Sequence, residues 1–509
     1  RQVKGSIHQK EDGHFEISLP FDCDNIHLPN NYEVAKRRLA SLKKKLVRDT
    51  QYRLDYSNFM KEIISKHYAE PVSTDNIQGP EGRTWYLPHH GVYHAQKPEK
   101  IRVVFDCSAE YKGQSLNEHL LPGPDLINSL VGILCRFRKD RIALTCDIEA
   151  MFHQVSVTPA YRDYLRFLWW EDGNLSTEPR IFRMAVHLFG ATSSPGCVNV
   201  ALKSTADIFE KDCGSKAAEF VKRDFYVDEG LTSVASIEEA QQLIDSTRIL
   251  CSKGGFRLHK FASNAREVLQ HVNEDDRHGS MKNFDLNVQR LPLQNAVGIY
   301  WCLESDTLLF RVQLQDKPLT RRGLLSTISS VFDPLGLIAP FMLLGKKLLQ
   351  EICKTNGGEW DDPLPDDMKI RWSHWRNDLI QITKLKVPRC YKDEHLGEIK
   401  KVELHHFSDA CQDGYGQCSY LRLIDDHQNV STSLVMGKAR VAPLKSITIP
   451  RLELTAAATS AKVSNFLNKE LKYEAIKHVF WTDSMVVLGY IANDSKRFHI
   501  FVSNRVQLI

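Results

Sequence analysis

The sequence lacks several patterns that define common classes of protein. Its twelve cysteines are scattered, and none forms a CxxC pair or a Cys/His grouping with zinc spacing. No apolar run approaches the roughly 20 residues of a membrane span, so no membrane partner is expected. The tripeptides Asp-Thr-Gly and Asp-Ser-Gly, typical of paired aspartic-peptidase carboxylates, do not occur. These absences favour free thiols in a reducing, intracellular compartment.

Net charge is also small. A formal charge of +4 over 509 residues does not by itself predict a polyanionic partner. Two local clusters are more basic, at 36–48 (KRRLASLKKKLVR) and 97–102. Such clusters suit a phosphate backbone, but a solvated helix face gives the same pattern, and the sequence leaves both interpretations open.

Hydrophobic periodicity predicts a mixed α and β chain, long enough for roughly three domains. Strand-like runs precede and alternate with helical runs up to about residue 252. Beyond residue 400 the order strand, strand, strand, helix, strand, helix predicts an α/β domain. The expected elements before residue 400 are helices at 32–47, 49–67, 194–211 and 236–252, strands at 83–106, 141–157 and 180–187, a hairpin at 220–234, a second hairpin at 296–312 and two helices broken at Asp333-Pro334.

Two acidic positions stand out in the first half. Asp147 lies inside the apolar run IALTCDIEAMF, where a carboxylate is costly unless it is paired or binds a metal. Asp228 and Glu229 follow the apolar residues 225–227 at a predicted hairpin turn. Carboxylates at the ends of adjacent strands can hold two Mg²⁺ ions, although solvent-facing strand-end acids would give the same pattern.

Longer phrases make the pattern specific. The chain resembles the reverse transcriptases of Bel/Pao-type retrotransposons in WYLPHHGVYH (85–94), RVVFDCSA (102–109), SLNEHLLPGPDL (115–126), DIEAMFHQV (147–155), RFLWW (166–170), FGATSSPG (189–196), FYVDEGLTS (225–233), GGFRLHKFASN (254–264) and SVFDPLGLIAP (330–340). The resemblance implies an α+β right-hand polymerase with fingers, palm and thumb, followed by an α/β RNase H-like domain that lacks its C-terminal end.

The resemblance also implies roles for individual residues. Asp147 and Asp228 correspond to the metal-binding and catalytic acids of the palm, with Glu229 beside them. Phe152 corresponds to the aromatic gate that excludes a ribose 2′-hydroxyl, at a position expected to be partly open. Ordinary core packing is the alternative for Phe152. The other implied nucleotide-binding residues are Lys97, Arg102, Phe189, Gly190 and Lys260.

One position departs from the family pattern. The turn carries Val-Asp-Glu, whereas the family has Val-Asp-Asp. The extra methylene of Glu229 fits poorly with the strict octahedral geometry of Mg²⁺. We therefore expect a polymerase that is slowed but not abolished, and relatively better with Mn²⁺.

A second acidic set lies after residue 400. Asp409 ends the strand VELHHFSDA, Glu453 lies early in an Ala-rich helix, and Asp483 ends the strand HVFWTDS. These acids resemble the catalytic, metal-binding carboxylates of RNase H and are expected to converge on one cleft. Taken singly, each could be a capping or surface acid. No candidate for a fourth acid is present, so weak or absent hybrid cleavage is expected.

The predicted organisation has four parts. An N-terminal helical lead-in covers 1–80, fingers and palm cover 81–275, a thumb and connection covers 276–400, and a truncated RNase H-like domain covers 401–509. The third part resembles a segment labelled as a Pao-type A17 aspartic peptidase. Because the required tripeptides are missing, Asp333 is interpreted as part of a helix break.

The leading hypothesis is an RNA-directed DNA polymerase, a nucleotidyltransferase that uses two Mg²⁺ ions per active site, or Mn²⁺. Expected partners are an RNA template, a DNA primer, RNA–DNA hybrid, dNTPs and other polyprotein segments (gag, protease and integrase). Cytoplasmic virus-like particles are the expected location. A catalytically impaired relic that still binds nucleic acid and an aspartic peptidase are the alternatives.

Overall fold

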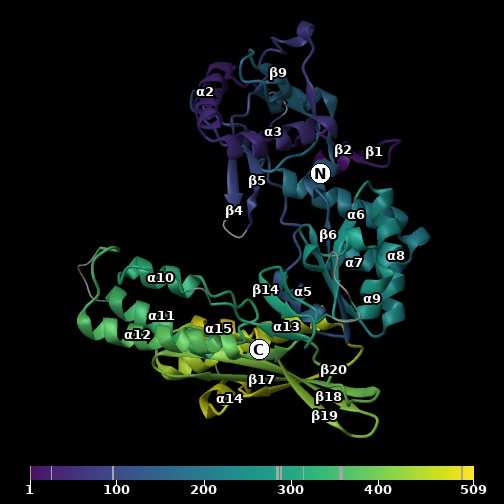
Figure 1. The fold of residues 1–509 in the computed structure, drawn as a ribbon. Helices are drawn as coiled ribbons and strands as arrows, with labels where there is room; N and C mark the ends of the chain where they lie inside the picture. Colours follow the sequence, from purple (N-terminus) through teal and green to yellow (C-terminus); the bar gives the residue numbers. More distant parts are fainter. Residues whose placement is uncertain are drawn as a thin grey trace. The chain divides into compact units, whose positions relative to one another are not determined.

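The chain divides into two compact units in a computed structural model. Unit 1 comprises Arg1–Ile127, Asp147–Arg223 and Leu243–His259, and unit 2 comprises Asn128–Cys146, Asp224–Gln242 and Lys260–Ile509 (Figure 1). The structure describes the chain except for residues 1, 24–25, 95–96, 282–285, 287–288, 313, 355–358 and 494–496. Among the described residues, no helix is both long and apolar enough to cross a membrane.

Unit 1 begins with helices whose buried positions follow helical spacing. In α2 (Tyr32–Arg48) the buried residues are Ala35, Leu39, Leu42 and Leu46, one stripe facing the core. Asp49 ends α2 and begins α3 (Thr50–Ser65), because its side chain accepts the Tyr52 N–H at 2.9 Å. Both helices match the predicted ranges. Unit 1 also contains α1 (Gln2–Ser6), α4 (Leu116–His119), α6 (Ser194–Cys213), α7 (Ser215–Arg223) and the C-terminal part of a helix that begins in unit 2.

Short sheets pack against these helices around an aromatic core that includes Trp85, Tyr56 and Trp169. The hairpin formed by β4 (His89–His94) and β5 (Lys97–Phe105) confirms the strands predicted in this region. Two three-stranded sheets complete the unit. They have the orders β1-β2-β7 and β3-β9-β8, with β1 (His8–Gln9), β2 (Phe15–Ile17), β7 (Ser156–Val157), β3 (Ala69–Pro71), β9 (Arg180–Met184) and β8 (Arg166–Trp169).

A four-stranded sheet carries the first acidic motifs. Its order is β10-β11-β6-β12, with β10 (Phe225–Tyr226), β11 (Glu229–Val234), β6 (Ile142–Ile148) and β12 (Leu258–Ser263). The continuous strand expected at 141–157 is wrong, because Ala150 adopts a left-handed φ of 47° and a 3₁₀ turn follows. The hairpin expected at 220–234 is shorter, because 220–223 complete α7. The neighbouring helices are α5 (Leu130–Phe137), α8 (Ile237–Lys253) and α9 (Arg266–His271).

The middle of unit 2 contains a second small sheet and three helices. The sheet order is β13-β14-β15-β16, with β13 (Leu293–Ala296), β14 (Ile299–Cys302), β15 (Thr307–Leu309) and β16 (Lys386–Pro388). Trp372 and Trp375 stack in the core of the helical part. The helices are α10 (Arg321–Ser329), α11 (Ala339–Lys354) and α12 (Asp366–Gln381), and the predicted break at Asp333-Pro334 falls between the first two.

The C-terminal part has the predicted order of elements. Its sheet runs β19-β18-β17-β20, and β20 pairs in parallel with β17. A crossover through α13 makes this parallel pairing possible. The elements are β17 (Ile399–Ala410), β18 (Gly414–Asp425), β19 (Val430–Val441), α13 (Ile449–Leu471), β20 (Ile476–Trp481), α14 (Met485–Ile491) and α15 (Ile500–Val506).

Two buried arginines join segments of unit 2 that are far apart in sequence. Arg138 donates to the carbonyl oxygens of Leu434 at 2.9 Å and Arg389 at 3.0 Å. Arg389 in turn forms an ion pair with Asp306 at 2.7 Å. Because buried guanidinium groups are costly unless fully paired, these contacts fix the end of α5 against β16 and β19. The C-terminal sheet therefore packs as part of unit 2.

Candidate active sites

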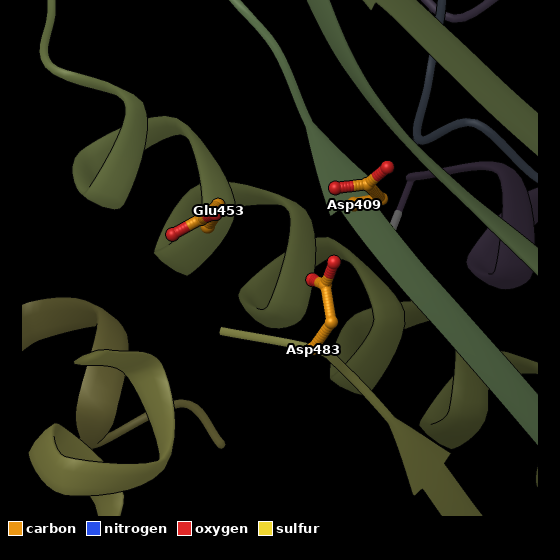
Figure 2. Close-up of side chains that lie close together, drawn as sticks. All are labelled: Asp409, Glu453 and Asp483. Carbon is orange, nitrogen blue, oxygen red and sulfur yellow. The ribbon is translucent and has the colours of Figure 1, made fainter. Parts of the chain in front are cut away.

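Three carboxylates meet in the C-terminal part of unit 2, as the sequence predicted. One oxygen each of Asp409, Glu453 and Asp483 lies within 4.8 Å of the others, and the side chains come from a strand, a helix and the end of another strand (Figure 2). No ion pair with Lys or Arg is found for these acids among the described residues. An all-oxygen donor set of this kind fits Mg²⁺ or Mn²⁺.

The local sequence explains how each acid is held. Glu453 lies in the first turns of α13, and Pro450, the second residue of this helix, is in the first turn, where proline is tolerated. Ser484 donates a hydrogen bond to Glu453 at 2.6 Å, and the same hydroxyl caps α14 by accepting the Val487 N–H at 3.3 Å. The Asp409 carboxylate accepts its neighbour's N–H, that of Ala410, at 2.7 Å. Ser484 therefore orients one acid while fixing the helix that follows Asp483.

Asp147 lies on β6, one residue before the strand ends, and is partly buried. Its carboxylate contacts His259 Nε2 at 2.9 Å within unit 1. Just beyond the end of β6, Glu149 pairs at 2.5 Å with Arg257, which precedes β12, and this hydrogen bond lowers the pKa of Glu149. The His259 contact did not emerge from the sequence, although the residue lies in the quoted phrase GGFRLHKFASN.

The second acidic motif forms a tight turn. Asp228 lies between β10 and β11, after Val227, which has a φ of 58°. A β-branched residue rarely adopts this conformation, and such strain persists where surrounding structure enforces it. Both oxygens of Glu229 accept the N–H of Val297, at 3.2 and 3.1 Å. The strand β11 is next to β6 in the sheet, whereas the meeting of Asp228 with Asp147 remains a prediction.

Three of the predicted nucleotide-binding residues form one cluster in unit 1. The rings of Phe152 and Phe189 have centroids 4.3 Å apart, and the guanidinium of Arg102 lies 5.5 Å from the Phe189 centroid. Gly190 has a φ of 109°, and a Cβ there would collide with the carbonyl of Phe105, so glycine is required. The expectation that Phe152 is partly open is wrong. The residue is only 5% exposed, and the Phe189 ring packs against it.

Asn117 supports this cluster and was missed by the sequence reasoning. Its amide donates to the Gly190 carbonyl at 2.9 Å, and its oxygen accepts the Thr192 N–H at 2.9 Å. A capping box formed by Ser115 and Glu118 fixes the short helix that carries Asn117. The Ser-x-x-Glu spacing in SLNEHL was the available signal, but it predicts a helix start and not the loop contact.

The remaining predicted residues are placed less fully. The side chain of Lys97 lies outside the described residues, although its backbone begins β5. Lys260 lies on β12 with a φ of 53°. Asp333, the acid of the peptidase-labelled segment, accepts the N–H groups of Leu337 and Ile338 at 2.9 Å each. Burial raises the pKa of Asp333, and these contacts fit the predicted helix-break role.

Comparisons with known proteins match part of the chain to a protein family. Residues 320–484 match the model of the Pao retrotransposon-like RNaseH-like domain. The match starts inside the segment predicted as thumb and connection, and it includes Asp409, Glu453 and Asp483. No curated protein matches the chain.

Two solved structures share the fold. The foamy viral protease-reverse transcriptase dRH in complex with double-stranded DNA is 13% identical, with a TM-score of 0.56, 99% of this chain covered and 72% of that chain. The foamy viral protease-reverse transcriptase in complex with RNA/DNA hybrid is 11% identical, with a TM-score of 0.51 and coverages of 99% and 56%. At these identities the likeness establishes the fold.

The fold and the acidic site therefore define a class: the chain is a mixed α/β protein similar to a retroviral reverse transcriptase, with an RNase H-like domain. Together with the family match, they support the more specific assignment predicted from the motifs, a segment of a Bel/Pao-type retroelement polyprotein.

Proposed function

We propose that the chain is an RNA-directed DNA polymerase that also carries a hybrid-cleaving RNase H site. The observation that supports the polymerase most directly is the order of its motifs on a reverse-transcriptase fold. Asp147 is the second-last residue of β6, and the Val-Asp-Glu turn follows β10, with β11 beside β6 in one sheet. The substrates are an RNA template, a DNA primer and dNTPs, and gag, protease and integrase segments are the proposed polyprotein partners.

In the polymerase reaction Asp147 and Asp228 would hold the metal ions. Two Mg²⁺ ions, when bound, activate the primer 3′-hydroxyl and stabilise charge on the triphosphate. His259 orients the Asp147 carboxylate through the hydrogen bond observed here. The Arg102 guanidinium supplies charge-assisted donors to the triphosphate, and Phe152 limits space at the sugar. Lys97, Gly190 and Lys260 complete the proposed nucleotide site.

In the RNase H-like domain Asp409, Glu453 and Asp483 would hold two divalent ions against the scissile phosphate. The metals supply the activated water and stabilise the departing oxygen. Ser484 keeps Glu453 oriented toward the site. Here the supporting observation is stronger than in the polymerase part, because all three oxygens are already grouped.

The test is primer extension by the full chain on an RNA template, with Mg²⁺ and with Mn²⁺. Extension that needs dNTPs and a divalent ion supports the polymerase. Hybrid binding without any extension would identify a nucleic-acid-binding relic.

The proposed domain boundaries can be tested by limited proteolysis of the same protein. Protease-resistant fragments should correspond to 81–275, 276–400 and 401–509.

A further inference from the structure

The outward face of α2 is strongly cationic. The helix contains seven Lys or Arg residues and one acid, Glu33. Arg37, Lys44 and Arg48 are exposed, and helical periodicity places them opposite the buried stripe that starts at Ala35. The three cations therefore form a row along the helix side farthest from the core.

These cations have no carboxylate partners among the described residues, although several other cations of unit 1 do. Elsewhere Lys66 pairs with Glu62 at 2.7 Å and Lys253 with Asp212 at 2.8 Å. On α2, the Nε of Arg37 donates at 3.3 Å to a backbone carbonyl of its own helix. Lys44 and Arg48 are four residues apart and so are neighbours on the helix surface. The repulsion between their like charges destabilises the helix. Stability therefore does not explain the row.

The partner that fits is a regularly charged polyanion. Eleven residues separate Arg37 from Arg48, which corresponds to about 16 Å of helix. The outward row contains no aromatic residue on which an unpaired base could stack. Single-strand binding usually combines positive charge with such stacking platforms, whereas duplex backbones are held by charge alone.

We propose that the outward face of α2 binds the phosphate backbone of a nucleic-acid duplex, independently of base sequence. The choice of nucleic acid among polyanions rests on the proposed function. The surface shares no residue with the acidic and nucleotide-binding sets described above, and EDTA removes the divalent ions, so binding at α2 can be measured without catalysis.

The experiment compares the parent chain with the triple variant Arg37→Gln, Lys44→Gln, Arg48→Gln. Binding of a short RNA–DNA duplex is followed by fluorescence anisotropy in EDTA at several salt concentrations. Three lost phosphate contacts reduce the slope of log K against log salt by about 2.7. Between about 50 and 200 mM salt, the parent should therefore lose about 40-fold more affinity than the variant.

The matched control is Lys10→Gln, Lys66→Gln, Arg180→Gln. It changes net charge equally, but each of its cations is ion-paired in the structure. The control should keep the slope of the parent chain. The double variant Arg37→Lys, Arg48→Lys should also keep it, because it retains the positive charges. Gln is well tolerated in helices, so the α2 variant should fold. Melting curves check that all variants are folded.

Equal slopes in the two triple variants would overturn the proposal, because the effect would then depend only on net charge. A preference for a single strand of equal length would also overturn the duplex assignment. Failure of the polymerase proposal is distinguishable, since it would abolish primer extension in the parent without altering the difference in slope.

Discussion

The two acidic regions of this chain differ in how completely they are formed. In the RNase H-like domain, oxygens of three carboxylates, from β17, α13 and the segment just after β20, already lie within 4.8 Å of one another. In the polymerase motifs, Asp147 contacts His259 and Glu229 contacts the backbone of Val297. In the first region the acids lie next to one another, with hydrogen bonds from Ser484 and a backbone N–H, whereas in the second each acid contacts a residue distant in sequence. The grouped acids are therefore the ones placed to share a bound cation, whereas Asp147 and Glu229 are oriented by contacts within the protein.

The largest effect is expected from Asp228→Asn. If Asp228 binds the catalytic metals, primer extension should fall at least about 10³-fold, equivalent to about 4 kcal/mol of transition-state stabilisation. Steady-state extension on one RNA template measures the loss. Asp172→Asn is the control, since this exposed acid lies in a left-handed turn that Asn tolerates. Extension that survives in Asp228→Asn would sink the catalytic assignment.

Phe152→Ala tests the buried aromatic pair. Removing a buried ring should cost about 3–5 kcal/mol of unfolding free energy, and it should also admit ribonucleotides. Chemical denaturation measures the first effect and competition between dNTPs and rNTPs the second. Phe182→Ala removes another buried ring of unit 1 and should cost stability alone. Unchanged sugar selectivity in Phe152→Ala would leave Phe152 as core.

Asp409→Asn tests whether the grouped acids hold a divalent ion. In an Asp228→Asn background, Mg²⁺ at ten times its dissociation constant should stabilise the folded chain by about 1.4 kcal/mol. The added Asp409→Asn change should remove this gain, as measured by melting temperature against Mg²⁺ concentration. Asp413→Asn serves as control, because Asp413 lies between β17 and β18 and pairs with Lys347 of α11. Equal stabilisation of both variants would show that the triad does not bind the ion.

His259→Ala should affect only the polymerase activity. The expected effect is no larger than the loss of Mg²⁺ stabilisation in Asp409→Asn. Loss of the hydrogen bond to Asp147 should lower kcat about tenfold, or about 1.4 kcal/mol, and change KM for dNTP little. His259→Gln keeps a donor and should recover most of the rate. A parallel fall in both variants, without a change in the ratio of Mn²⁺ to Mg²⁺ activity, would indicate a purely structural role.

Glu229→Gln should have the smallest effect. The amide oxygen can still accept the Val297 N–H, so extension should stay within about twofold of the parent. A roughly tenfold gain in Glu229→Asp would instead support the view that the long side chain slows a metal site. The two substitutions separate a backbone contact from metal coordination.

Much of the fold could be predicted because the relevant signals are local. The stripe of Ala35, Leu39, Leu42 and Leu46 predicted α2, and the alternating pattern after residue 400 predicted β17 to β20 in order. The interruption at Ala150 could not be predicted, because a left-handed residue there is imposed by the surrounding structure. The shortened hairpin had a similar cause, since Phe220 and Val221 are buried as part of α7.

By itself the sequence determined the chemical identities and order of the acids, because strand ends and helix starts carry recognisable patterns of residues. It also determined the family resemblance through its long motifs. Only the tertiary structure decided which groups meet. The contacts of Asp147 with His259, Glu229 with Val297 and Asn117 with Gly190 join residues 68 or more positions apart. Such contacts depend on strand pairing and loop packing, which no local periodicity specifies.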